Sequence, residues 1–114
     1  MDLDRYQSLA ARTRNPALDE PSLLLDAAAG LAEEAGEILG IVRKHLFQRR
    51  PLDRDAVTGE LGDALWCLSA VATSLGVSLG DVAHSNVDKL RRRYPDGFTP
   101  DAAAIRRDEA DRER

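Results

Sequence analysis

Two long stretches of the chain, residues 23–47 and 56–75, carry apolar side chains every three or four residues. This period is typical of long amphipathic helices. A proline and several charged residues at positions 48–53 separate the stretches, which predicts two antiparallel helices joined by a short turn. Alanine and leucine are abundant and β-branched residues are few, so the sequence predicts an all-α protein.

Two shorter helices are expected on either side of this pair. Residues 3–13 have apolar side chains at helical spacing, and residues 79–93 repeat the pattern after a break. In the second of these, we expect four apolar side chains to turn inward: Val82, Ala83, Val87 and Leu90. Four helices of this length predict a single domain over residues 1–99. The remaining residues, 100–114, are mostly Ala, Asp, Glu and Arg and predict a frayed or disordered tail.

The ends of the two long helices can also be predicted. Ser22 is the expected N-cap of the first, Asp53 or Asp55 that of the second, and Gly76 its C-terminal stop. Three glycines lie inside the first long helix, where each costs about 1 kcal/mol relative to alanine. The glycines therefore predict a close approach by a neighbouring helix.

Composition narrows the class of protein. The chain has 114 residues and a net charge of −4, which argues against duplex nucleic acid as the main partner. Its start is polar and charged, without a signal-peptide core, and its longest apolar run is far too short to span a membrane. The single cysteine excludes an internal disulfide. These features predict a soluble, cytoplasmic protein without a membrane partner.

Two acidic clusters lie on the long helices. In each, two carboxylates stand three residues apart, Glu34 with Glu37 and Glu60 with Asp63. On a helix this spacing places their Cβ atoms about 5–6 Å apart on one face. Most such pairs form solvated faces, but Glu60 lies within the apolar stripe of its helix, where carboxylates are seldom left without a partner.

A cation between the clusters would relieve the repulsion among these carboxylates. Antiparallel helices joined by a short turn bring the four groups together, and carboxylate oxygens are hard ligands that suit Mg²⁺ or Mn²⁺. The cysteine and histidine spacing of a zinc site is absent from the sequence. The clusters therefore predict a divalent metal site.

The last predicted helix carries a cationic face. Asn86, Lys89 and Arg93 lie at positions i, i+3 and i+7, so they share one side. Arg91 and Arg92 are explained by the attraction of cations to a helix C-terminus, which is worth up to about 1 kcal/mol. Opposite a carboxylate metal site, we expect Lys89 and Arg93 to bind phosphate groups. Asn86 would orient a phosphate or a base edge.

Two further side chains lie near the second acidic cluster. Trp66 follows Asp63 by three residues, and it either stacks on a base or packs in the core. Cys67 lacks the histidine or aspartate pattern that would make it a nucleophile, so we expect it to pack.

Three blocks of sequence occur in a fixed order: LAEEAGE at residues 31–37, ELGDALW at residues 60–66 and NVDKLRRRYPDGF at residues 86–98. Together they resemble the MazG-type nucleoside triphosphate pyrophosphohydrolases of the all-α NTP pyrophosphatase superfamily. The family pattern is EExxE, then ExxD, then N-x-x-K-L-x-x-R-Y-P. The interval of 22 residues between the first two blocks fits that pattern.

The resemblance implies a four-helix MazG-like bundle that forms a homodimer or homotetramer through its long helices. It also implies Mg²⁺-dependent hydrolysis of a (d)NTP to a (d)NMP and pyrophosphate, as housecleaning of the nucleotide pool. Carried over by position, the metal ligands would be Glu34, Glu37, Glu60 and Asp63, and the phosphate-binding residues would be Lys89 and Arg93.

The resemblance leaves the general base open. Glu33 would either support the metal ligands or deprotonate the attacking water, a role that a ligand such as Glu34 could also take. In relatives selective for pyrimidine deoxynucleotides an aromatic residue stands four positions after the ExxD aspartate. This chain has Cys67 there and departs from that mode of base recognition.

Two related activities fit the same blocks: hydrolysis of dUTP or dCTP, and hydrolysis of phosphoribosyl-ATP. A protein of another class also fits the acidic clusters, namely a non-catalytic helical assembly module with a structural cation. Lys89 and Arg93 distinguish these readings, because a structural cation needs no phosphate clamp.

Overall fold

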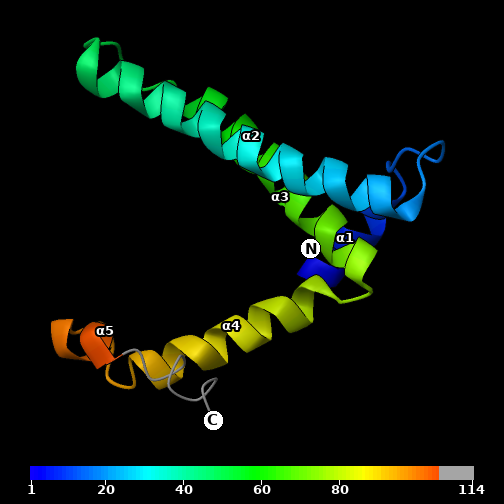
Figure 1. Cartoon of the computed structure of the whole chain (residues 1–114). Coiled ribbons are helices and arrows are strands. Elements are labelled where there is room, and N and C mark those ends of the chain that lie inside the picture. Colours follow the sequence, from blue (N-terminus) through cyan, green and yellow to red (C-terminus); the bar gives the residue numbers. More distant parts are fainter. Residues whose placement is uncertain (106–114) are drawn as a thin grey trace. The chain divides into compact units, whose positions relative to one another are not determined.

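The computed structural model describes residues 1–105, and within that range it contains five helices and no strand (Figure 1). The predicted all-α class is confirmed. The helices are α1 (Leu3–Ala11), α2 (Glu20–Phe47), α3 (Arg54–Leu75), α4 (Leu79–Arg93) and α5 (Pro100–Ile105). The first four occupy the four predicted stretches, and α5 forms the start of the predicted tail. The rest of that tail, residues 106–114, lies outside the described residues.

The chain divides into two compact units. The first, Met1–Leu79, contains α1, α2 and α3, and the second, from residue 80 onward, contains almost all of α4 and α5. The predicted boundary between a domain of residues 1–99 and a tail stays a prediction. Among residues 1–105 no single helix is both long and apolar enough to cross a membrane. α3 and α4 taken together pass that test by length and composition alone.

Aspartate N-caps determine where the first three helices begin. Asp2, Asp19 and Asp53 each accept a hydrogen bond from the backbone N–H three residues further on, at 2.7, 2.8 and 3.0 Å. Such a cap typically contributes about 1 kcal/mol. The prediction of Ser22 as a cap was wrong, because Asp19 caps α2 instead. Pro21 then falls in the first turn, where its missing N–H leaves no bond unmade.

α2 and α3 lie side by side and antiparallel, joined by residues 48–53 (Figure 1). α3 ends at Gly76, whose φ of 71° is the left-handed conformation that glycine adopts without steric cost. The predicted stop is therefore confirmed. This arrangement turns one face of each long helix toward the other.

The core of the first unit is made largely of small side chains. Ala27 of α2 and Cys67, Ala70 and Ala72 of α3 are all less than 9% exposed. A Cβ atom built on Gly30 would lie only 2.9 Å from the Cys67 sulfur, so α2 and α3 approach closely at this point. The glycine-based prediction of close approach is confirmed at Gly30. At the other two glycines of α2 no heavy atom lies within 4 Å of a built Cβ, so there the prediction was wrong.

Several large apolar side chains remain exposed. On α2, Leu25 and Phe47 are 71% and 79% exposed. On α4, Val82, Val87 and Leu90 are 43%, 42% and 42% exposed, so the prediction that they turn inward was wrong for these three. Ala83 is half-buried. The apolar period of a helix identifies its preferred face, but it does not say what covers that face.

Replacing Gly30 by alanine should destabilise the protein by about 1–3 kcal/mol, even though alanine is the better helix former. The new methyl group would meet the buried Cys67 sulfur at 2.9 Å. Gly40→Ala is the matched control, because nothing lies within 4 Å of its new Cβ. It should stabilise α2 by up to about 1 kcal/mol.

Urea unfolding of both variants measures the difference in the free energy of unfolding. Adding Cys67→Ala to Gly30→Ala should recover part of the loss, because it removes the clashing sulfur. Equal stability of Gly30→Ala and Gly40→Ala would contradict close packing of α2 against α3.

Candidate metal centre

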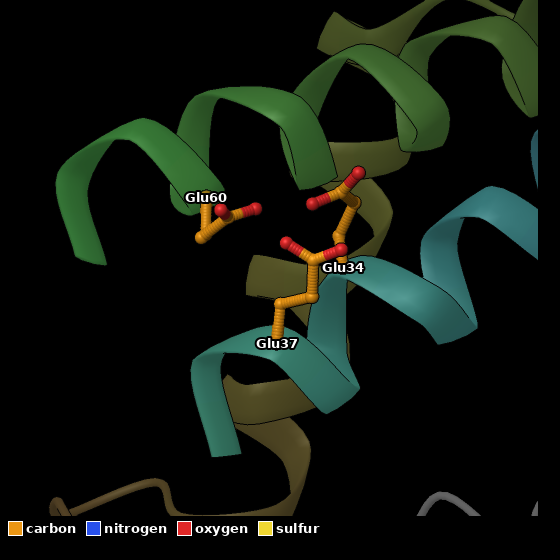
Figure 2. Close-up of side chains that lie close together, drawn as sticks. All are labelled: Glu34, Glu37 and Glu60. Atoms are coloured by element: carbon orange, nitrogen blue, oxygen red, sulfur yellow. The ribbon is translucent and has the colours of Figure 1, made fainter. Parts of the chain in front are cut away.

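Three of the four predicted metal-binding carboxylates come together between α2 and α3. Glu34 and Glu37 project from α2 and Glu60 from α3, and Figure 2 shows their carboxylates turned toward one another. Each offers one oxygen, and these oxygens all lie within 4.8 Å of one another. The spacing of three residues on α2 and the antiparallel pairing with α3 together produce this cluster.

The cluster is partly withdrawn from solvent. Glu34 and Glu60 are half-buried, whereas Glu37 is exposed. One oxygen of Glu34 and one of Glu60, the Oε2 atom in each case, are buried without a hydrogen-bond partner among the described residues. Buried carboxylate oxygens are normally paired with a donor or a cation, so a cation bound between the helices would satisfy both atoms.

The electrostatics of the cluster favour added positive charge. The pKa of Glu60 is raised above its ordinary value of 4.5, chiefly because a hydrogen bond between its carboxyl group and that of Glu34 requires a proton. The pKa of Glu37 is raised for the same reason, through a hydrogen bond with Glu60 and then through the charge of Glu60. Carboxylates that take up protons more readily than usual can also bind a metal ion instead of those protons.

Asp63 and Glu33 lie beside the cluster rather than in it. Asp63 is exposed and is not among the three residues whose oxygens converge, but its charge contributes to the raised pKa of both Glu37 and Glu60. Glu33 is exposed on α2, next to Glu34. The roles of Asp63 as a ligand and of Glu33 as a supporting residue or base stay predictions.

The neighbouring side chains of α3 are fixed by contacts within the first unit. Trp66 is half-buried, and its indole N–H donates a 2.7 Å hydrogen bond to the hydroxyl of Thr13. Cys67 is buried, and burial, followed by the charges of nearby carboxylates, raises the pKa of its thiol. A neutral thiol packed against Gly30 agrees with the predicted packing role. No motif in the sequence pointed to Thr13.

The predicted phosphate-binding residues lie in the second unit. Asn86, Lys89 and Arg93 all belong to α4, which is continuous from Leu79 to Arg93, so they share one face of one helix as expected. Asn86 is exposed, and Lys89 and Arg93 are half-buried. Their function in binding phosphate stays a prediction.

The fold is all-helical, and carboxylates from two antiparallel helices converge in it. These two features define a helical protein with a candidate divalent-metal site. A family model described as the MazG nucleotide pyrophosphohydrolase domain matches residues 24–98, which is most of the chain. The chain therefore belongs to the MazG nucleotide pyrophosphohydrolase family.

One relative is a phage protein, the Gene 37 protein of Mycobacterium phage L5. The two sequences are 38% identical over 72 residues, which covers 60% of this chain and 63% of the phage protein. The chain thus spans less than two thirds of the length of that relative. No solved structure matches the chain.

The raised pKa values predict how pH affects the stability of the metal-free protein. Below the ordinary value of 4.5, Glu37 and Glu60 are protonated whether the chain is folded or unfolded. Above it the unfolded chain releases these protons first, so it binds fewer protons than the folded protein, and stability falls as pH rises through the raised pKa. In EDTA, these two groups should therefore stabilise the fold more at pH 4.5 than at pH 7.

Glu60→Gln tests this expectation, because the amide cannot ionise. Urea unfolding in EDTA should show a smaller loss of stability between pH 4.5 and pH 7 for this variant than for the wild type. Glu33→Gln, which changes a neighbouring exposed glutamate outside the cluster, should keep the wild-type pH dependence. A Glu60→Gln protein with the wild-type pH dependence would show that the carboxylates do not repel one another.

Proposed function

We propose that this protein is a cytoplasmic, Mg²⁺-dependent nucleoside triphosphate pyrophosphohydrolase that cleaves a (d)NTP to a (d)NMP and pyrophosphate. Its role would be housecleaning of the nucleotide pool. The observation that carries the proposal is the cluster of three carboxylate oxygens within 4.8 Å, formed by Glu34, Glu37 and Glu60. Membership of the MazG family supports the reaction class.

The donor set fits Mg²⁺ better than a softer metal. The three converging groups are all carboxylates, which are hard oxygen donors. Two of their oxygens are buried and have no hydrogen-bond partner among the described residues, as expected of atoms that a cation would satisfy. We assign Glu34, Glu37 and Glu60 as ligands and add Asp63, one turn further along α3. A bound Mg²⁺ would supply positive charge to the reacting phosphates and would acidify a water. Mn²⁺ could substitute.

The chain's own residues would accept the proton of the attacking water and hold the phosphate groups. Water adds its oxygen to the α-phosphorus, the bond from that phosphorus to the bridging oxygen breaks, and pyrophosphate leaves with the bridging oxygen. Glu33 or Glu34 would accept the proton of the water, because a carboxylate can serve as a general base. Lys89 and Arg93 would hold the leaving phosphates as cations, and Asn86 would orient a phosphate or the base.

The exposed apolar surface of α2 supports the proposal that the protein works as a homodimer or homotetramer. Leu25, Leu39, Leu46 and Phe47 are each more than 60% exposed. Apolar surface exposed on this scale is the kind that oligomerisation covers. A second copy pairing along the long helices would cover it.

The rival reading is a helical assembly module in which the same cation is only structural. It explains the carboxylate cluster equally well, but it gives no function to a face that carries Asn86, Lys89 and Arg93 together. Within the catalytic reading, dUTP or dCTP and phosphoribosyl-ATP are the alternative substrates.

The test is turnover of the purified protein on a panel of canonical and damaged NTPs and dNTPs, with phosphoribosyl-ATP included. Pyrophosphate and orthophosphate are measured separately, with Mg²⁺ and with EDTA. We expect Mg²⁺-dependent release of pyrophosphate. Glu34→Gln should reduce it by at least about a hundredfold, because one site carboxylate is lost. Asp55→Asn, an exposed acid in the first turn of α3, is the matched control and should retain activity.

The outcomes separate the two readings. Release of pyrophosphate that depends on both Mg²⁺ and Glu34 would establish the hydrolase and name its substrate. If Mg²⁺ raises the melting temperature but no nucleotide is hydrolysed, the assembly module is correct instead.

A further inference from the structure

The orientation of Trp66 is set by a residue far away in the sequence. The indole N–H is the only hydrogen-bonding group of its side chain, and it donates to the Thr13 hydroxyl at 2.7 Å. Thr13 follows α1 and lies outside residues 24–98, the range that matches the MazG family. The segment that precedes the family domain thus contacts a residue inside it.

Thr13 is well suited to accept this hydrogen bond. Its hydroxyl donates its single proton to the Ala10 carbonyl at 2.7 Å, which leaves its lone pairs for the indole. The backbone N–H of Thr13 donates to the same carbonyl at 3.0 Å. Two bonds to one carbonyl hold the hydroxyl in place at the end of α1.

Hydrogen bonds on both sides of Thr13 fasten its segment to α3 and to the residues that directly follow α3. Before it, the Gln7 amide donates to the Val77 carbonyl at 2.9 Å and accepts from the Leu79 N–H at 2.8 Å. After it, the Arg14 guanidinium donates to the Ser74 hydroxyl at 2.9 Å. Thr13 is therefore held against α3 independently of its own bond to Trp66.

Trp66 is on α3, the helix that carries Glu60 of the candidate metal centre. It follows Asp63 by three residues, which makes the two side chains neighbours on the helix surface. It is half-buried, so part of its ring is available to a ligand. An aromatic face beside a polyphosphate site is suited to stacking on a nucleotide base.

We propose that Thr13 is a positioning residue that holds the Trp66 indole in the orientation that stacks on the base of the substrate. The inference rests on the proposed function and extends it to a segment outside the family domain. Stacking depends on the tilt of the ring, and a hydrogen bond at the ring edge selects that tilt. An exposed hydrogen bond of this kind contributes little to the free energy of folding, so its effect falls on substrate affinity.

The experiment uses the full-length protein and its fluorescence, because Trp66 is the single tryptophan of the chain. Thr13→Val keeps the shape of the side chain but cannot accept the indole N–H, whereas Thr13→Ser can. Ser74→Ala is the matched control, since it removes another hydrogen bond of the same segment without touching Trp66. The melting temperature of each variant checks that it is folded.

We expect Thr13→Val to raise KM about three- to tenfold at nearly unchanged kcat, as suits the loss of one orienting hydrogen bond. Its indole emission should change, with stronger quenching by acrylamide. Thr13→Ser and Ser74→Ala should keep the wild-type KM and emission. In a Trp66→Phe background, Thr13→Val should have no further effect on KM, because the group that it orients is gone.

Two failures are distinguishable. A wild-type protein that hydrolyses its substrate, with a Thr13→Val variant of unchanged KM, would overturn this inference alone. An equal rise in KM for Ser74→Ala would also overturn it, because the segment would then act only through stability. If the wild type hydrolyses no nucleotide, the proposed function fails and this inference fails with it.

Discussion

The mutual repulsion of three carboxylates, held within 4.8 Å of one another between α2 and α3, is the constraint on which the first unit depends. Packing must oppose that repulsion, and it does so with small side chains such as Ala27 and Ala70, which let the helices lie close. The same closeness keeps the carboxylates from moving apart. A cation bound between the carboxylates would offset this repulsion, and a ligand that binds only the folded state stabilises that state.

Much of the fold follows from the sequence because helices are local. The period of apolar residues predicted four stretches that the structure shows as helices, and Gly76 stops α3 as expected. The start of α2 was misplaced because Asp19 and Ser22 can both cap a helix. The structure decides between them, since the backbone N–H of Ser22 donates a hydrogen bond to the Asp19 carboxylate. Val82 of α4 is exposed, although its spacing predicted that it would turn inward. The spacing could not predict this exposure, because it identifies the apolar face of a helix but not what covers that face.

In the candidate site, too, contacts within one helix or one predicted hairpin could be predicted from the sequence, whereas contacts between more distant segments could not. Glu34 and Glu37 could be placed together from their spacing on one helix, and Glu60 joins them once the hairpin is predicted. Asp63 shares a helix with Glu60, yet it is exposed and is not among the residues whose oxygens converge. Thr13 was missed because it is separated from Trp66 by 53 positions, a contact that no local pattern records.

The close approach of α2 at Gly30 also restricts how the protein can evolve. The relatives with an aromatic residue at the position of Cys67 need space there for a ring. In this chain even a methyl group on Gly30 would lie 2.9 Å from the thiol sulfur. A ring in place of the thiol would therefore require α2 and α3 to move apart, and the carboxylates on the two helices with them. The distance between α2 and α3 thus limits both the size of the side chain at position 67 and the spacing of the carboxylates.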